Sequence, residues 1–133
     1  MTGPVFLGLA EIIEIHDDQI KRYGGLAGIR QIELLKSAAA MPAASFGGEY
    51  LHRDIFEMAA AYLFHIVSNH PFIDGNKRTG AVAALVFLAM NGLEPQIDET
   101  DIEAIVISVA EGKSDKAAIA RFFRSDGGKR NEF

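Results

Sequence analysis

Hydrophobic residues recur at intervals of three and four along most of this chain, which is the spacing of one face of an α-helix. The first such segment runs from about Leu9 to Arg22, with isoleucines on one side and acidic residues on the other, and Tyr23-Gly24-Gly25 ends it. The same spacing predicts helices over about 30–40, 53–69, 76–91, 100–111 and 115–124. Strand patterns are scarce, so we expect a compact all-α bundle of about six helices.

Local signals mark several helix ends. Thr100 and Glu103 form a capping box, which predicts the start of the fifth helix, and Asp115 is a favoured N-cap for the sixth. Asn91-Gly92 is typical of a helix C-terminus. The stretch from about 125 onward is polar and contains glycine. We therefore predict a single domain over residues 1–133, with a disordered tail from about residue 125.

The predicted helix at 76–91 is apolar nearly all round, because residues 81–90 carry no polar side chain. A helix of this kind is usually covered on every side by others. We expect it to be the central helix of the bundle.

Residues 41–51 do not follow the helical pattern. Pro42 and Gly47-Gly48 disfavour a helix, whereas Phe46 and Tyr50 favour extended backbone. We expect a loop or a small β-hairpin here, with Gly47-Gly48 near its turn.

Composition excludes several classes of protein. A net charge of −5 argues against general affinity for nucleic acid, whose phosphates attract basic surfaces. The chain has no cysteine, so it has neither disulfides nor a thiolate zinc site. The longest apolar run, residues 81–90, is shorter than the roughly 18 residues of a membrane-spanning helix. With no secretory signal visible, we expect a cytoplasmic protein that contacts neither membrane nor nucleic acid directly.

The chemically richest stretch lies between the third and fourth predicted helices, at His70-Pro71-Phe72-Ile73-Asp74-Gly75-Asn76-Lys77-Arg78-Thr79-Gly80. The first amides of the helix that begins here lack partners inside the helix and carry the positive end of its dipole. Gly75 allows a sharp turn and close approach of a ligand. Lys77 and Arg78 are unfavourable at this helix end unless an anion is bound there. We predict a phosphate site.

Asp74 and His70 add chemistry to that site. A carboxylate beside phosphates is accommodated when a hard cation such as Mg²⁺ bridges the two. A neutral imidazole at position 70 can accept a proton from an attacking hydroxyl. Each residue alone has a plainer explanation: Asp74 as an N-cap, His70 as a charge partner of the helix end, and the two cations as a solvated face. Their combination within nine residues favours one site.

The other histidines receive structural interpretations. His16 and His52 are predicted to be surface or loop residues, and His65 a helix-packing residue. No two histidines have the i, i+4 spacing of a helical zinc site.

Residues His70 to Arg78 resemble the signature of the Fic/Doc family, H-x-F-x-[D/E]-G-N-x-R. The resemblance is to the Doc branch, the death-on-curing toxins, because Lys77 stands where Fic adenylyltransferases have Gly and Ala81 where they have a second Arg. It extends to Arg22-Tyr23-Gly24-Gly25, to the stretch from Phe46 to Tyr50 and to Asn91-Gly92, and so spans roughly residues 10–124.

This resemblance implies the all-helical Fido fold and a set of residue roles. His70 is implied as the catalytic base, and Asp74 as the Mg²⁺ ligand. The phosphates of ATP are implied to lie against Gly75, Asn76, Lys77 and Arg78, and the segment that aligns the target protein is a flap containing Phe46, Gly47 and Gly48.

The implied function is that of the toxin in a type II toxin–antitoxin pair. It would transfer the γ-phosphate of ATP to a Ser or Thr hydroxyl of a translation-related protein and halt growth. The internal inhibitory pattern of some relatives, [S/T]-x-x-x-E-[G/N], is absent, since Ile107 precedes Glu111-Gly112 by four positions. A separate antitoxin is therefore implied as a partner. The alternatives are AMP transfer to a protein hydroxyl and a non-catalytic module that binds a nucleotide or a partner.

Overall fold

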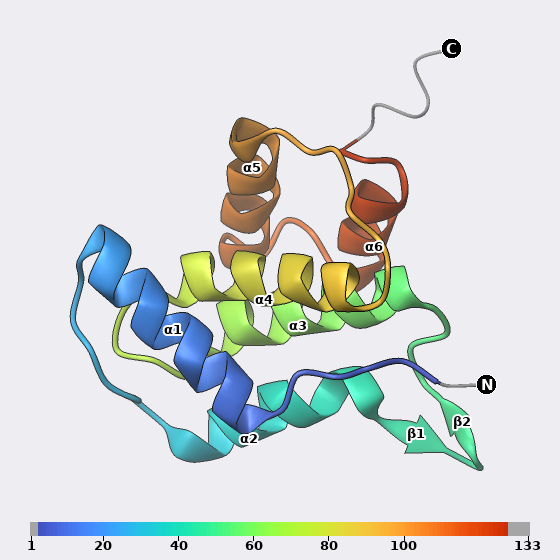
Figure 1. Cartoon of the computed structure of the whole chain (residues 1–133), viewed down its shortest axis with the longest axis horizontal. Coiled ribbons are helices and arrows are strands. Elements are labelled where there is room, and N and C mark those ends of the chain that lie inside the picture. The colour runs from blue at the N-terminus through green and yellow to red at the C-terminus, as the bar shows by residue number, and fades with distance from the viewer. Residues whose placement is uncertain (1–2, 128–133) are drawn as a thin grey trace.

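The computed structural model describes residues 3–127, which form six α-helices, a 3-10 turn and one β-hairpin (Figure 1). This confirms the predicted mostly helical fold with a small hairpin. In chain order the elements are α1 (Leu9–Tyr23), α2 (Ile32–Ala40), η1 (Met41–Ala43), β1 (Ser45–Phe46), β2 (Glu49–Tyr50), α3 (Ile55–Asn69), α4 (Asn76–Met90), α5 (Glu99–Ala110) and α6 (Lys116–Arg124).

The centre of the bundle is the antiparallel pair α3 and α4, with α1 and α2 on one side and α5 and α6 on the other (Figure 1). The two helices approach closely at Gly80, where an added Cβ would lie 2.8 Å from a methyl carbon of Val67. Helix α4 is central as expected, and α3 shares that position, with eight buried residues against seven in α4. The apolar circumference of both helices explains this, because each is covered on several sides.

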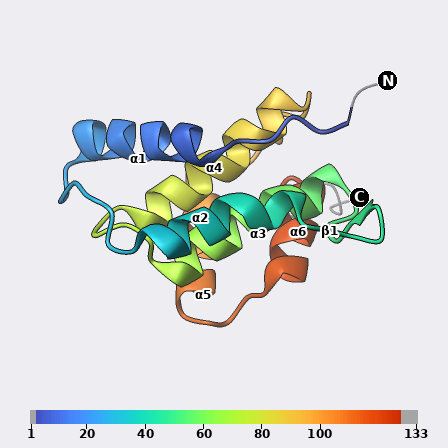
Figure 2. The ribbon, with the colours of Figure 1, turned by 90° about the horizontal axis from the view of Figure 1, so that it is seen from below.

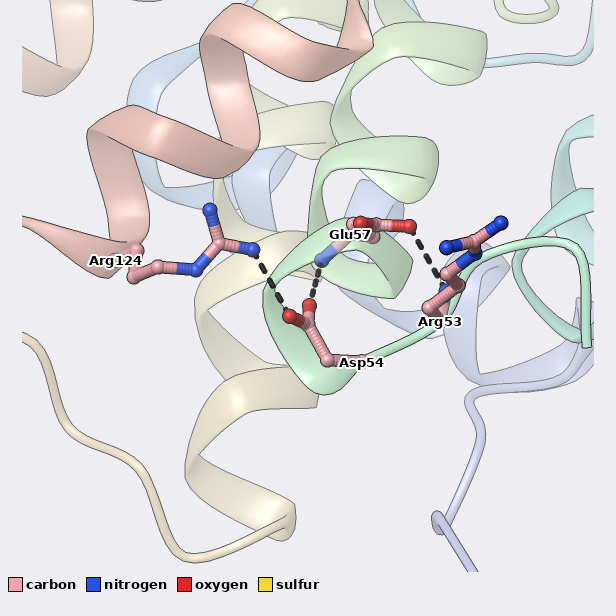
Figure 3. Close-up of polar contacts among 4 residues, drawn as sticks. All are labelled: Arg53, Asp54, Glu57 and Arg124. Carbon is pink, nitrogen blue, oxygen red and sulfur yellow. Dashed lines mark hydrogen bonds and ion pairs between the residues drawn. The ribbon is translucent and has the colours of Figure 1, made fainter.

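The N-terminus of α3 is anchored by a group of charged side chains (Figure 3). Asp54 is the N-cap, and its Oδ1 accepts from the backbone N–H of Glu57 at 2.8 Å. Its Oδ2 accepts from the Arg124 guanidinium at 2.9 Å, which ties α6 to the start of α3. The Glu57 carboxylate accepts from the backbone N–H of Arg53 at 2.8 Å.

The hairpin forms where the glycine pair predicted a turn. Strands β1 and β2 are antiparallel, with Ser45 opposite Tyr50, and Gly47 and Gly48 both have positive φ. The Phe46 side chain is 82% exposed, whereas the Tyr50 ring lies 5.7 Å from the ring of Phe6. The hairpin therefore packs on the N-terminal segment and projects at one end of the molecule (Figure 2).

Helix boundaries agree with the local signals except at α5. The fifth helix begins at Glu99 with Asp98 as its N-cap, so the predicted capping box at Thr100 lies inside the helix. Asp115 caps α6 as predicted, because its side chain accepts from the backbone N–H of Ala118. Residues 125–127 continue α6 as a hydrogen-bonded turn, and the rest of the predicted tail lies outside the described residues.

The longest helices have 15 residues, and no helix between residues 3 and 127 could span a membrane.

Candidate active site

The loop between α3 and α4 is held in place by the connection between α1 and α2. Residues Ile29 and Phe72 form an isolated antiparallel bridge. On either side of it, the Arg30 N–H donates to the Pro71 carbonyl at 2.7 Å, and the Ile73 N–H donates to the Gly28 carbonyl at 3.1 Å. Two segments about 40 residues apart in sequence thus form one small strand-like unit at the same end of the molecule.

His70 ends α3 in the left-handed region, with φ 49° and ψ 55°. This conformation is uncommon for a residue with a Cβ and indicates a local constraint. The constraint is the Arg30 guanidinium, whose Nε donates to the His70 carbonyl at 2.6 Å and whose second amine donates to the Asn69 carbonyl at 2.9 Å. The His70 residue itself is exposed, so a substrate can reach its imidazole.

Asp74 is an exposed carboxylate held at both oxygens. Oδ2 accepts from the Leu26 N–H at 3.1 Å, and Oδ1 accepts from the Gly75 N–H at 2.9 Å. These two hydrogen bonds, with a smaller contribution from the charges of Arg78 and Lys77, lower the pKa of Asp74 below its ordinary value. The carboxylate is therefore ionised at neutral pH, and each oxygen keeps a lone pair for another ligand.

The glycine at position 25 is required by this carboxylate. A Cβ on Gly25 would lie 2.7 Å from Asp74 Oδ2, and the residue has φ 116°. No side chain can occupy that space without moving the carboxylate.

The Asn76 side chain holds the loop together by hydrogen bonds to its backbone. This buried side chain accepts from the Phe72 N–H and donates to the Phe72 carbonyl, both at 3.0 Å. Asn76 was predicted to lie against the phosphates, and its side chain holds the backbone of the loop. The backbone N–H groups of Asn76, Lys77 and Arg78 have no hydrogen-bond partner within residues 3–127. We call these three groups the open amides. Gly75, the N-cap with φ 78°, sets the direction of these amides.

The two cations of the first turn are placed differently. The Arg78 guanidinium donates to the Gly24 carbonyl at 2.9 Å and lies 5.5 Å from the centre of the Tyr23 ring. Lys77 is exposed and makes no ion pair with any other residue that the structure describes. Neither cation forms an ion pair within residues 3–127, so both charges remain at this helix end, and the Lys77 ammonium has no hydrogen-bond partner there.

Lys77 and Arg78 also line a cavity of about 450 Å³ between α1, α4 and α5. Its walls are mostly apolar, and Glu99 and Glu103 of α5 contribute acidic groups. The apolar lining consists of Ala81, Val82, Leu85, Ile102, Val106 and Ile107.

The donor set suits a cation that arrives with a phosphate. No group of three or more His, Asp or Glu side chains in the described part of the chain could hold a metal by itself. Mg²⁺ in nucleotide sites is commonly bound by one or two carboxylates together with substrate phosphates. Asp74 beside three open amides fits that arrangement.

The hairpin lies at the other end of α3 from this loop, and the target-aligning role predicted for Phe46, Gly47 and Gly48 stays a prediction. The structure places Phe46, Gly47 and Gly48 before the N-terminal end of α3, whereas His70 lies at its C-terminal end. Helix α3, which has 15 residues and is about 22 Å long, runs between the two. Segment 24–31 does lie beside the loop between α3 and α4. From the sequence, Gly24-Gly25 was predicted to end the first helix, and residues 30–31 to begin the second.

One histidine was assigned wrongly from sequence: His16 lies on α1 and is buried under the loop. His52 lies in the loop between β2 and α3, as predicted, but is only 8% exposed. His65 packs as predicted. The Nε2 atoms of His52 and His65 each lie 3.1 Å from Nζ of Lys116, and burial lowers the pKa of His65 to about 4.

Sequence reasoning also missed Arg30. Neither it nor His16 carries a local signal, because their partners lie 40 and 58 positions away.

Comparison with known proteins agrees with this geometry. Residues 6–88 match the model of the Fic/DOC family. The chain is 32% identical over 114 residues to a protein from Escherichia phage P1 named protein kinase doc, covering 86% of this chain and 89% of the relative. It is 35% identical over 100 residues to a protein from Mycolicibacterium smegmatis named toxin Doc, covering 74% of this chain and 77% of the relative. With the signature loop, its helix and its supports in place, the chain belongs to the Fic/DOC family.

Proposed function

We propose that this protein is the toxin of a type II toxin–antitoxin pair and a protein kinase. It transfers the γ-phosphate of ATP to a Ser or Thr hydroxyl of a translation-related protein in the cytoplasm. The observation that carries the proposal is the convergence at one helix end of an ionised carboxylate, three open amides, a free lysine and an exposed histidine. The names of the two relatives, a kinase and a toxin, support it.

The amides of the first turn of α4 and the Lys77 ammonium bind the phosphate oxygens, since both favour negative charge. Mg²⁺ on Asp74 would neutralise charge that develops on those oxygens. His70 takes the proton of the target hydroxyl as its oxygen bonds to the γ-phosphorus. The bond from that phosphorus to the β–γ bridging oxygen breaks, and ADP leaves. Positioning and charge neutralisation are sufficient for such a transfer.

Phosphate transfer is favoured over AMP transfer by the residues at two positions. Lys77 fills space that a glycine would leave open, and Ala81 on the cavity wall has no charge to hold a second phosphate group. Incubation of the protein with translation factors and ATP labelled at either the α- or the γ-phosphate tests this. We expect the target to retain γ-label only. Retention of α-label would mean AMP transfer, and retention of neither label would favour a non-catalytic module.

We propose that segment 26–30 aligns the target. The backbone groups of Gly28 and Arg30 point to the catalytic loop, so those of Ile29 point to the opposite edge, where they have no partner among the described residues. An unpaired strand edge can bind an extended peptide by backbone pairing. Leu26 and Ile73, both more than half exposed, offer apolar contacts beside it. Ile29→Pro removes the N–H of that edge, and we expect it to weaken target phosphorylation more than ATP binding.

An antitoxin is the proposed partner, and the cavity between α1, α4 and α5 is its proposed site. Its apolar walls suit the apolar face of a helix, and an occupant there would cover Lys77 and Arg78. Ile107→Glu places a charge on the cavity wall at a residue that is 48% exposed, so the fold should tolerate it. We expect that variant to escape neutralisation when the toxin and its antitoxin are co-expressed, while its growth arrest alone is unchanged.

A further inference from the structure

We propose that His16 is a positioning residue that orients Asp74 from beneath, through the backbone of the catalytic loop. This inference rests on the proposed function, because it concerns the carboxylate that would bind Mg²⁺ with the nucleotide.

His16 lies on α1 and is 1% exposed. Its Nε2 is 2.8 Å from the backbone carbonyl oxygen of Asp74. Its ring stacks on Phe72 with centres 3.8 Å apart and planes within 3° of parallel. A Cβ on Gly75 would lie 3.6 Å from the same ring. One buried imidazole therefore contacts two residues of the loop and leaves little room for a side chain at a third, Gly75.

The direction of the hydrogen bond follows from its partner. A carbonyl oxygen only accepts, so Nε2 of His16 carries the proton and donates. The other ring nitrogen, Nδ1, is 3.8 Å from the carboxylate of Asp17, which is too long for a hydrogen bond. An imidazole with a proton on Nε2 meets these requirements.

The Asp74 carbonyl needs this donor because of how the helix begins. Gly75 is in the left-handed region, and the first intrahelical bond of α4 is accepted by the Gly75 carbonyl from the Thr79 N–H. The Asp74 carbonyl is left outside the helix ladder and points toward α1. Buried carbonyls are almost always paired, and His16 supplies the partner.

Asp74 is consequently held on both sides. His16 fixes its carbonyl from below, while the Leu26 and Gly75 N–H groups fix its two carboxylate oxygens. Without the donor on His16, the peptide between Asp74 and Gly75 can rotate. Such a rotation would misdirect both the carboxylate and the adjoining helix amides. Groups that orient a metal ligand in this way typically change metal affinity by roughly 10–100-fold when they are replaced.

A plainer role for His16 is core packing against Phe72 alone, and two matched variants separate the two roles. His16→Phe keeps an aromatic ring for the stack but removes the N–H donor. His16→Gln keeps an N–H donor of similar reach but removes the ring. The first readout is amide hydrogen exchange at Gly75 and Leu26 in the metal-free protein. The second is the Mg²⁺-dependent part of ATP binding, measured by calorimetry.

We expect faster exchange at both amides in His16→Phe, together with roughly tenfold weaker Mg²⁺-dependent binding of ATP. His16→Gln should keep slower amide exchange and tighter Mg²⁺-dependent binding of ATP than His16→Phe. In an Asp74→Asn background, His16→Phe should have no further effect on the Mg²⁺-dependent part of binding, because that part passes through the Asp74 carboxylate. The inference is overturned if His16→Phe matches the wild type in both readouts, or if its effect adds in full to that of Asp74→Asn.

Nitrogen NMR of the wild-type His16 ring keeps the test decisive even if a variant fails to fold. We expect the ring proton to be on Nε2 and to be protected from exchange with solvent. A proton on Nδ1 alone would contradict the inference. The proposed function fails separately: a wild-type protein that does not bind Mg²⁺·ATP overturns it. Wild-type binding that Asp74→Asn abolishes and His16→Phe leaves intact overturns only the role of His16.

Discussion

The Arg30 guanidinium donates a 2.6 Å hydrogen bond from Nε to the backbone carbonyl of His70. A second bond, 2.9 Å long, reaches the carbonyl of Asn69, so one side chain caps the C-terminus of α3. The residue that follows the helix is thereby held in the left-handed region, at φ 49°. The direction of the proposed catalytic imidazole is therefore set by a residue outside the signature loop.

Replacing Arg30 should impair the transfer more than it impairs folding. In Arg30→Ala the two carbonyls are exposed to water, so the stability loss should be modest, whereas His70 is free to leave its left-handed conformation. We expect a lower rate of transfer with nearly unchanged binding of Mg²⁺·ATP, measured by labelled transfer and calorimetry. Arg30→Lys, which offers a point charge in place of a fork of donors, should recover only part of the rate. Equal rates in Arg30→Ala and the wild type would contradict this.

Replacing His70 tests the base directly. The residue is exposed, so His70→Ala should retain the melting temperature of the wild type. General bases typically contribute about 10²–10⁴-fold to a rate, and we expect a loss of this order together with loss of growth arrest on expression. A folded His70→Ala protein that still arrests growth would show that proton abstraction by His70 is not needed.

The N-cap of α3 provides a control at the other end of the same helix. Asp54→Ala removes the bond to the Glu57 N–H and the ion pair with Arg124 (Figure 3). Loss of an N-cap costs about 1 kcal/mol, so the free energy of unfolding should fall by about that amount in denaturant titration. Binding of Mg²⁺·ATP should be unchanged, since the loop lies at the opposite end of α3. If Asp54→Ala bound nucleotide poorly, the N-cap of α3 would have to affect the loop at the other end of the helix, which contradicts this expectation.

Stability should fall on acidification because of His65. Burial first, and then the charge of Lys116, lowers the pKa of His65 to about 4 from an ordinary value of 6.5. Between these two values the unfolded chain binds a proton that the folded protein does not, so stability rises with pH. The stability that comes from keeping His65 neutral is present in full above pH 6.5 and is lost progressively as the pH falls toward 4.

Chemical denaturation at a series of pH values checks this, with His65→Gln as the comparison. The variant should show a smaller loss of stability between pH 6.5 and 4. His52, whose pKa is also lowered by burial, remains in both proteins, so the difference between the two curves reports on His65 and on its coupling to His52. Parallel curves would mean that His65 does not titrate as the structure indicates.

The sequence alone determined the six helices, the hairpin turn at Gly47-Gly48, and the loop that joins a histidine, a carboxylate and two cations. These are local features: helical periodicity, glycine conformation and helix-end chemistry all act within a few residues. The boundary of α5 was misplaced, because Asp98 and Thr100 are both good caps and their local signals do not distinguish them.

Only the tertiary structure decided what surrounds the loop. Packing of α1 and α2 against α3 and α4 brings Arg30 to His70 and His16 under Asp74, and it places the hairpin at the far end of α3. These relationships join residues 40 to 58 positions apart through the burial of whole helix faces, which no short stretch of sequence encodes.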